Sequence, residues 1–273
     1  MSSPHITDAA TGAQSSSVQP SGARVTGRPG IPFTRLLHVE FRKLFDTRAA
    51  RILIVLMLLG ALGLQIIEVF LGDKETQASY QVYFGLGISL VSLLVPVIAI
   101  LATTAEWSQR TALATFMWEP RRVRVLAAKG LAALVVALVS VVVVAGFSAV
   151  TAFLGGTMRD GVDWSLSGSQ IAGYAIVMVV LVAQGIAFGA LLHNTAAALV
   201  TYFVAPLVLS TLTMLVSAIR DIAQWVDINI ASVPILEGDF TTDTVAKYAV
   251  SIAVWVVLPG IFGVLRTVRR EVK

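Results

Sequence analysis

Residues 125–154 read VLAAKGLAALVVALVSVVVVAGFSAVTAFL, a stretch in which Lys129 is the single charged residue. An α-helix needs about 20 consecutive apolar residues to cross the roughly 30 Å hydrocarbon core of a bilayer. This stretch is longer than that, so we expect a transmembrane helix that tilts or projects beyond the membrane. The segment therefore places the chain among membrane proteins.

Five further apolar runs of suitable length surround this segment. Two precede it and three follow it, at residues 52–71, 82–103, 171–192, 195–216 and 246–265. Pro206 and Pro259 fall inside the last two runs, but an isolated proline is tolerated within a membrane helix. We therefore predict an all-α, polytopic membrane protein whose six transmembrane helices form one domain over residues 31–273.

The composition agrees with this fold class. Hydrophobic residues make up 56% of the chain and charged residues 13%, whereas soluble domains carry about 25% charged residues. The chain has no cysteine, which excludes disulfides, thiolate metal sites and cysteine nucleophiles. Residues 1–30 are mostly small and polar, so we expect a disordered cytoplasmic tail. Nothing in the charge pattern indicates nucleic-acid binding.

The distribution of lysine and arginine predicts the orientation. Seven of these residues precede the first span, five lie between the second and third spans, and four follow the last span. The opposite side holds four, namely Lys74, Arg159, Arg220 and Lys247. Because basic loops stay in the cytoplasm, we expect a multi-pass protein of the cell membrane with both termini cytoplasmic.

The segment from Phe33 to Arg48 has apolar residues at three- and four-residue spacing, with charged residues between them. This pattern predicts an amphipathic helix that lies in the headgroup plane with its apolar face toward the bilayer. It is either a simple surface anchor or an elbow helix that also touches a cytoplasmic partner. The apolar face includes Phe33, Leu37, Phe41, Leu44 and Phe45.

The predicted cytoplasmic loop between the second and third spans begins at Glu106 and runs to Lys129. It contains two tryptophans, five basic residues and Pro120, which separates two short predicted helices. A short charged helix with aromatic residues suits docking against another protein. The alternative is ordinary positive-inside topology with tryptophans anchored at the interface.

The loop resembles the E-[YW]-x-x-x-T … T … P-x-R … K pattern of type-2 ABC transporter permeases, the membrane subunits of bacterial ABC exporters. The matching residues are Glu106, Trp107, Thr111, Thr115, Pro120, Arg122 and Lys129. The similarity extends over the elbow segment, the six spans, the very short inner turn between the fourth and fifth spans, and the long outer loop before the last span. It suggests that this outer loop, residues 217–244, forms short re-entrant or interfacial helices, and the alternative is an ordinary surface loop. Many members of the family have glycine where this chain has Arg110, which leaves the local turn geometry open.

The resemblance implies that residues 106–120 form a coupling helix in a groove of a separate ATP-binding subunit, beside the elbow helix. ATP and Mg²⁺ would bind to that subunit, and this chain would bind no cofactor. The chain itself contains no G-x-x-x-x-G-K-[ST] phosphate loop, so we expect a permease rather than an enzyme. A second permease copy or a sister permease and the lipid bilayer are the other expected partners.

Polar residues inside the spans are candidates for a transport pathway. They are Gln65 and Glu68 in the first span and Gln184 in the fourth. Glu68 is close enough to the outer interface to reach headgroups or water instead. Gly185 and Gly189 follow Gln184 and permit close helix packing, within the chain or in a dimer. Asn194 is placed to cap the fifth span.

Three functions remain open at this stage. The first is the permease subunit of an ATP-driven exporter that moves an unidentified, amphiphilic or lipid-like substrate out of the cytoplasm. The second is a stand-alone secondary transporter, against which stands the scarcity of charged residues at mid-membrane. The third is a scaffold or assembly protein that uses the same loops for docking without transport.

Overall fold

The computed structural model describes residues 31–73, 76–109, 111, 115, 117, 121–216 and 220–269. The predicted tail at residues 1–30 lies outside this part of the chain. Six segments of the described chain are long and apolar enough to cross a membrane. Five of them are α2 (Arg48–Leu71), α3 (Tyr80–Ser108), α5 (Arg122–Thr157), α6 (Gly168–Leu192) and α7 (Thr195–Leu215). The prediction of six helices that are long and apolar enough to cross a membrane is thereby confirmed.

The sixth span is a continuous helical segment with a local change of pitch. It consists of α10 (Thr242–Ile252), the π-helical turn η2 (Ala253–Val257) and α11 (Leu258–Arg269). Most helices extend beyond the predicted apolar runs, and α5 is the longest with 36 residues. The backbone hydrogen-bond ladder continues past the last apolar side chain, so hydropathy alone underestimates helix length.

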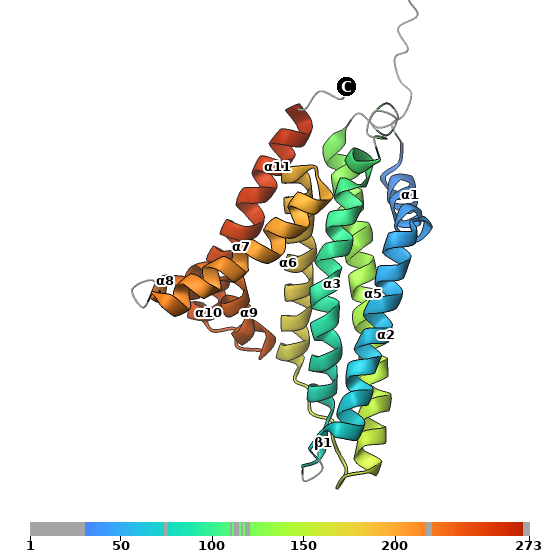
Figure 1. Ribbon diagram of the computed structural model, residues 1–273, viewed down its shortest axis with the longest axis vertical. Helices are drawn as coiled ribbons and strands as arrows, with labels where there is room; N and C mark the ends of the chain where they lie inside the picture. The colour runs from blue at the N-terminus through green and yellow to red at the C-terminus, as the bar shows by residue number, and fades with distance from the viewer. Residues whose placement is uncertain are drawn as a thin grey trace, which may run out of the picture. The chain divides into compact units, whose positions relative to one another are not determined.

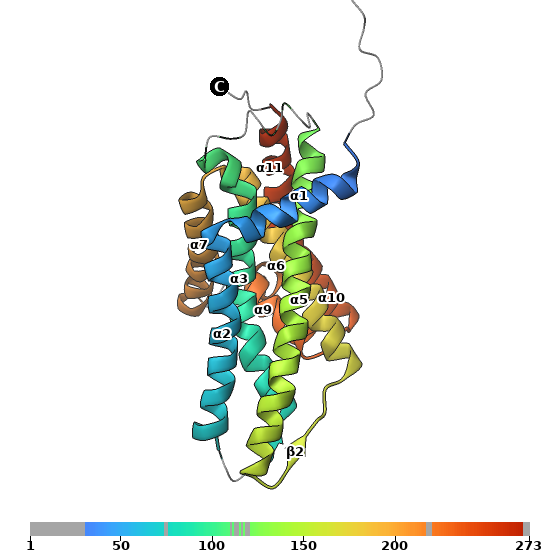
Figure 2. The same ribbon diagram turned by 90° about the vertical axis from the view of Figure 1, so that its right-hand side faces the viewer.

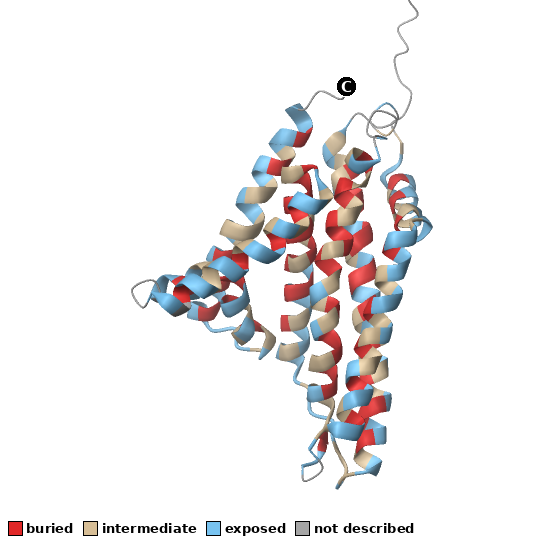
Figure 3. Ribbon diagram, in the orientation of Figure 1, coloured by how far each residue is buried: buried red, intermediate tan, exposed pale blue. Residues whose placement is uncertain are grey.

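The helices α2, α3 and α5 run side by side, and α6 packs against α3 on the other side (Figure 1). Buried residues concentrate on the facing sides of these helices, while outward faces are exposed, as suits lipid contact (Figure 3). Small residues permit the closest approach. A Cβ added at Gly185 would lie 2.7 Å from the Pro96 carbonyl oxygen, and one at Gly189 would lie 2.8 Å from the Thr103 Cβ. The glycine pair therefore serves packing within the chain.

The predicted amphipathic segment forms α1 (Phe33–Asp46), which runs crosswise to the spans beside α5 and α2 (Figure 2). Its buried residues include Leu36, which packs against Val125 and Ala128 of α5. Leu44 enters the main core. The chain turns into α2 at Thr47, whose hydroxyl donates a hydrogen bond of 3.3 Å to the Leu44 carbonyl.

At the opposite end, the short strands β1 (Ala78–Ser79) and β2 (Val162–Asp163) pair in parallel. The described part of segment 217–244, for which the resemblance suggests short helices, contains α8 (Arg220–Val226) and α9 (Ile228–Leu236). Asp227 caps α9, because its carboxylate accepts hydrogen bonds from the amides of Asn229 and Ile230. The ordinary surface loop considered as an alternative is not what the described part of this segment forms.

The turn between α6 and α7 needs only two residues. His193 adopts a left-handed conformation with φ of 50°, and the Asn194 side chain accepts a hydrogen bond of 2.9 Å from the Ala197 amide. The predicted cap of the fifth span is thus confirmed. The turn lies beside the end of α3, where several residues of the sequence motif gather.

Candidate functional site at the ends of α1, α3 and α5

A group of four charged side chains, three of them buried, joins three helices. Lys129 of α5 donates from Nζ to Glu40 Oε2 of α1 at 2.7 Å and pairs with Glu106 Oε1 of α3 at 2.6 Å. Lys43 of α1 pairs with Glu40 Oε1 at 2.6 Å and with Glu106 Oε1 at 3.3 Å. We call Glu40, Lys43, Glu106 and Lys129 the charge cluster. Its two carboxylates and two ammonium groups balance one another.

Burial differs sharply within the charge cluster. Glu40, Glu106 and Lys129 are nearly inaccessible, whereas the side chain of Lys43 is 43% exposed. Burial lowers the pKa of Lys43, but the hydrogen bond and negative charge of Glu40, together with Glu106, outweigh it and raise this pKa above the usual lysine value. Lys43 therefore stays protonated at physiological pH and completes the neutralisation of the two carboxylates.

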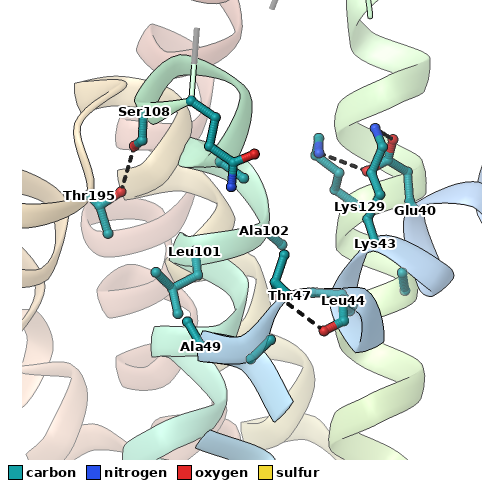
Figure 4. A pocket seen from close by; sticks show the side chains of 14 residues that line it. Glu40, Lys43, Leu44, Thr47, Ala49, Leu101, Ala102, Ser108, Lys129 and Thr195 are labelled. Atoms are coloured by element: carbon teal, nitrogen blue, oxygen red, sulfur yellow. Dashed lines mark hydrogen bonds and ion pairs between the residues drawn. The ribbon is translucent and has the colours of Figure 1, made fainter. Parts of the chain in front are cut away.

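A cavity of about 140 Å³ lies beside the charge cluster. Glu40, Lys43 and Lys129 line one side, and the hydroxyls of Ser108 and Thr195 line the other at 2.9 Å from each other (Figure 4). Thr195 is also 2.7 Å from the Thr104 hydroxyl, so the start of α7 is attached to the end of α3. Most of the remaining lining is alanine and leucine.

A second contact group surrounds the other side of the α3 end. The Trp107 ring lies edge-on to His193 with ring centres 4.4 Å apart. His193 Nε2 is 2.8 Å from the Thr267 hydroxyl of α11, and Arg122 of α5 donates to the Thr267 carbonyl at 2.5 Å. These contacts connect both flanks of the loop at residues 109–121 to α11 and to the α6–α7 turn.

The seven residues of the family pattern and Arg110 are the eight residues predicted to couple to an ATPase. The structure brings four of them together. Glu106 and Lys129 pair directly, while Trp107 and Arg122 meet around Thr267 and His193. The Thr111 amide donates to the Glu106 carbonyl at 2.9 Å, and the Thr115 amide donates to the Thr111 carbonyl at 3.2 Å. The two others, Arg110 and Pro120, lie outside the described residues, as does most of the predicted coupling helix.

The predicted apolar face of α1 divides into two parts. Leu44 is buried, and Leu37 and Phe41 are partly buried against the core formed by α2, α3 and α5. Phe33 and Phe45 are exposed. The middle of the apolar face therefore packs against the protein, whereas Phe33 and Phe45 at its two ends are open to lipid or to a partner protein.

The three polar residues considered for a pathway have different environments. Gln65 is fully buried, donates to the Ser148 hydroxyl at 2.9 Å and accepts from the Thr151 hydroxyl at 3.3 Å, which links α2 to α5. Glu68 pairs with the buried Arg159 at 3.4 Å, near the C-terminal end of α2. Gln184 is also buried but borders a groove between α3, α6, α7 and α9.

Sequence reasoning missed the role of Glu40 and Arg159. In the sequence, Glu40 is only one of several charged residues of the amphipathic segment, and Arg159 is one of four basic residues on the predicted outer side. The available signal was the position of Glu40 three residues before Lys43, on the face that also carries Leu36 and Leu44. An acid on an apolar helix face requires a buried partner.

Among the described residues, no three His, Asp or Glu side chains are placed to hold a metal ion. A comparison with models of known protein families found no match to this chain, and a comparison with curated proteins found none either.

Proposed function

We propose that this chain is the permease subunit of an ATP-driven exporter and that a separate ATP-binding subunit docks on the loop at residues 109–121 and on α1. The observation that carries the proposal is the charge cluster. It binds α1 to the end of α3 and to the start of α5, the two helices on either side of the loop.

Mechanical coupling requires a stiff connection between the docking surface and the spans. A charge that loses its partner in a buried site costs several kcal/mol, so the ends of α1, α3 and α5 resist separation. A displacement of the loop would therefore move α1 and these spans together. Closure of the ATP-binding subunits could then switch the spans between inward- and outward-facing states.

The proposal includes an orientation and an assembly. The loop, α1 and both termini lie in the cytoplasm, because the basic residues concentrate on that side. Two permease chains, identical copies or sisters, form the pathway with two ATP-binding subunits. ATP and Mg²⁺ bind to those subunits, and the substrate is an amphiphile that leaves the cytoplasm.

Site-specific photo-crosslinking in living cells tests the docking surface. A photoreactive residue replaces Met117, which is 77% exposed in the loop, and a matched control replaces Met158, which is 50% exposed at the far end of α5. We expect Met117 to crosslink a protein with a G-x-x-x-x-G-K-[ST] phosphate loop and Met158 to crosslink none. Equal yields of such a protein at both positions, or none at Met117, would overturn the proposal.

A crosslink at Met117 without ATP-dependent export would instead favour the scaffold hypothesis. Export of radiolabelled lipids or amphiphiles from inverted vesicles, with and without ATP, separates these two functions. The permease hypothesis requires transport that stops when the phosphate-loop lysine of the crosslinked partner is replaced.

A further inference from the structure

A groove lies between α3, α6, α7 and α9, and it shares no lining residue with the cavity beside the charge cluster. Its volume is about 440 Å³. Among the residues that line it, all of which are described, none carries a charge, and hydroxyl and amide groups alternate with apolar side chains. This lining differs from that of the groove between α5, α6 and α11, which is almost wholly apolar.

Gln184 is the distinctive residue of this groove. It is 1% exposed, yet its side-chain amide forms no hydrogen bond with any described residue. Gln65, the other buried glutamine of the spans, forms hydrogen bonds with Ser148 and Thr151. Among the described residues, the Gln184 amide is not one of the fully enclosed polar groups that lack a partner, so it reaches the space of the groove. A group that occupies the groove and bonds to this amide would gain a hydrogen bond.

The polar neighbours of Gln184 are arranged around the same space. Ser92 of α3 and Ser232 of α9 line the groove, and each hydroxyl donates to a carbonyl of its own helix, at 2.9 Å in both cases. Their oxygens retain the capacity to accept a hydrogen bond. Asn229, at the start of α9, also lines the groove.

Asp227, which is hydrogen-bonded to the groove residues Ser210 and Asn229, is not available to a ligand. Asp227 is fully buried, and its carboxylate accepts from the Ser210 hydroxyl and from the amides of Asn229 and Ile230. The groove consequently offers hydrogen-bond donors and acceptors without a free charge. Phe203 and Leu207 of α7 provide an apolar wall.

We propose that this groove binds an uncharged amphiphile, whose hydroxyl, amide or ester group bonds to Gln184 and whose hydrocarbon part lies against α7. The inference rests on the proposed export function, because it assigns the class of substrate. Cationic amphiphiles are excluded on physical grounds, since a buried cation needs a countercharge that the lining lacks. Membrane lipids and xenobiotics of this chemistry are both admitted.

The full chain in phosphatidylcholine nanodiscs provides the test. The probes are a photoreactive monoacylglycerol and an alkyltrimethylammonium of equal chain length with the same photoreactive group. We expect the neutral probe to label α6 and α7 in a saturable way that unlabelled monoacylglycerol competes. The cationic probe should label only the lipid-facing background.

Two substitutions distinguish recognition from stability. Gln184→Leu removes the unpaired amide, so we expect an unchanged or higher melting temperature and about five-fold weaker labelling. Gln65→Leu breaks two hydrogen bonds elsewhere, so it should lower the melting temperature but leave labelling of the folded protein intact. Ser232→Phe fills the groove from α9 and should abolish saturable labelling even if Gln184→Leu fails to fold.

Non-saturable labelling of the wild type, or saturable labelling that survives both Gln184→Leu and Ser232→Phe, would overturn the assignment. Equal saturable labelling by the cationic probe would overturn the proposed substrate class. The nanodiscs contain no ATP-binding subunit, so these results are independent of crosslinking at Met117. If the neutral probe does not label the groove but Met117 crosslinks the ATP-binding subunit, only the proposed substrate class is rejected. If the probe labels the groove but Met117 crosslinks no such subunit, only the proposed coupling to an ATPase is rejected.

Discussion

At the scale of single residues, Lys129 is the centre of the contact between α1, α3 and α5. It is an ammonium group buried between two carboxylates from different helices. The sequence predicted a role for Glu106 and Lys129 through the family pattern, but it did not predict that they pair. Nor could it predict the contact between Lys129 and Glu40, which are 89 residues apart, because helix rotation and packing decide which buried charges meet.

Replacement of Lys129 by methionine leaves Glu40 and Glu106 close together with Lys43 as their remaining cation. We expect Lys129→Met to lower the free energy of unfolding by about 3 kcal/mol, since breaking one partner of a buried ion pair leaves an uncompensated charge. Thermal unfolding in detergent measures the change. Lys247→Met is the matched control, because the ion pair of Lys247 with Asp243 is largely exposed on the acid's side and should contribute less than about 1 kcal/mol. Similar losses in both variants would contradict the central role of Lys129.

The contribution of Lys43 to stability is expected to depend on pH. Its pKa is raised in the folded protein by Glu40 and Glu106 despite the opposing effect of burial. Protonated Lys43 therefore stabilises the fold below the unfolded-state pKa of about 10.4, and this contribution is lost as the pH rises through the folded-state pKa. We expect wild type to melt higher than Lys43→Gln between about pH 7 and pH 10, with the difference shrinking above this range. A difference that grows at higher pH would show that the sign is wrong.

At the scale of elements, the sequence predicted the helices well because their determinants are local. The length of the apolar runs predicted the long helices, and apolar residues at three- and four-residue spacing predicted α1. The side chain of Asn194 predicted a helix cap. The π-helical turn at Ala253–Val257 could not be predicted, because no proline or glycine interrupts that pentapeptide. The packing of α9 on α6 was equally hidden, since it brings Gly173 against the backbone of Ile235.

The contact between α3 and α6 depends on Gly185. A Cβ there would lie 2.7 Å from the Pro96 oxygen and 2.8 Å from the Ala99 Cβ, whereas nothing lies within 4 Å of a Cβ at Gly146. We expect Gly185→Ala to destabilise the protein by about 1–3 kcal/mol through overpacking. Gly146→Ala should be neutral or stabilise by up to about 1 kcal/mol through helix propensity. Melting temperatures that shift in the same direction would contradict this packing argument.

At the scale of the whole molecule, the proposed function requires the charge cluster to lie at the cytoplasmic end of the helices. The charge cluster, Trp107 and Arg122 all lie at the end of the bundle where the loop at residues 109–121 leaves the spans. Basic residues predicted that this end is cytoplasmic, and docking of an ATP-binding subunit is feasible only there. The orientation is therefore the condition on which the proposed function depends.

Cysteine accessibility in intact cells tests this condition most directly, because the chain has no native cysteine. Single variants Met117→Cys and Met158→Cys place a thiol at exposed positions at opposite ends of α5 and its preceding loop. With a membrane-impermeant maleimide, we predict that Met158→Cys is labelled in intact cells and that Met117→Cys is labelled only after permeabilisation or denaturation. Labelling of Met117→Cys in intact cells as fast as Met158→Cys would contradict the account.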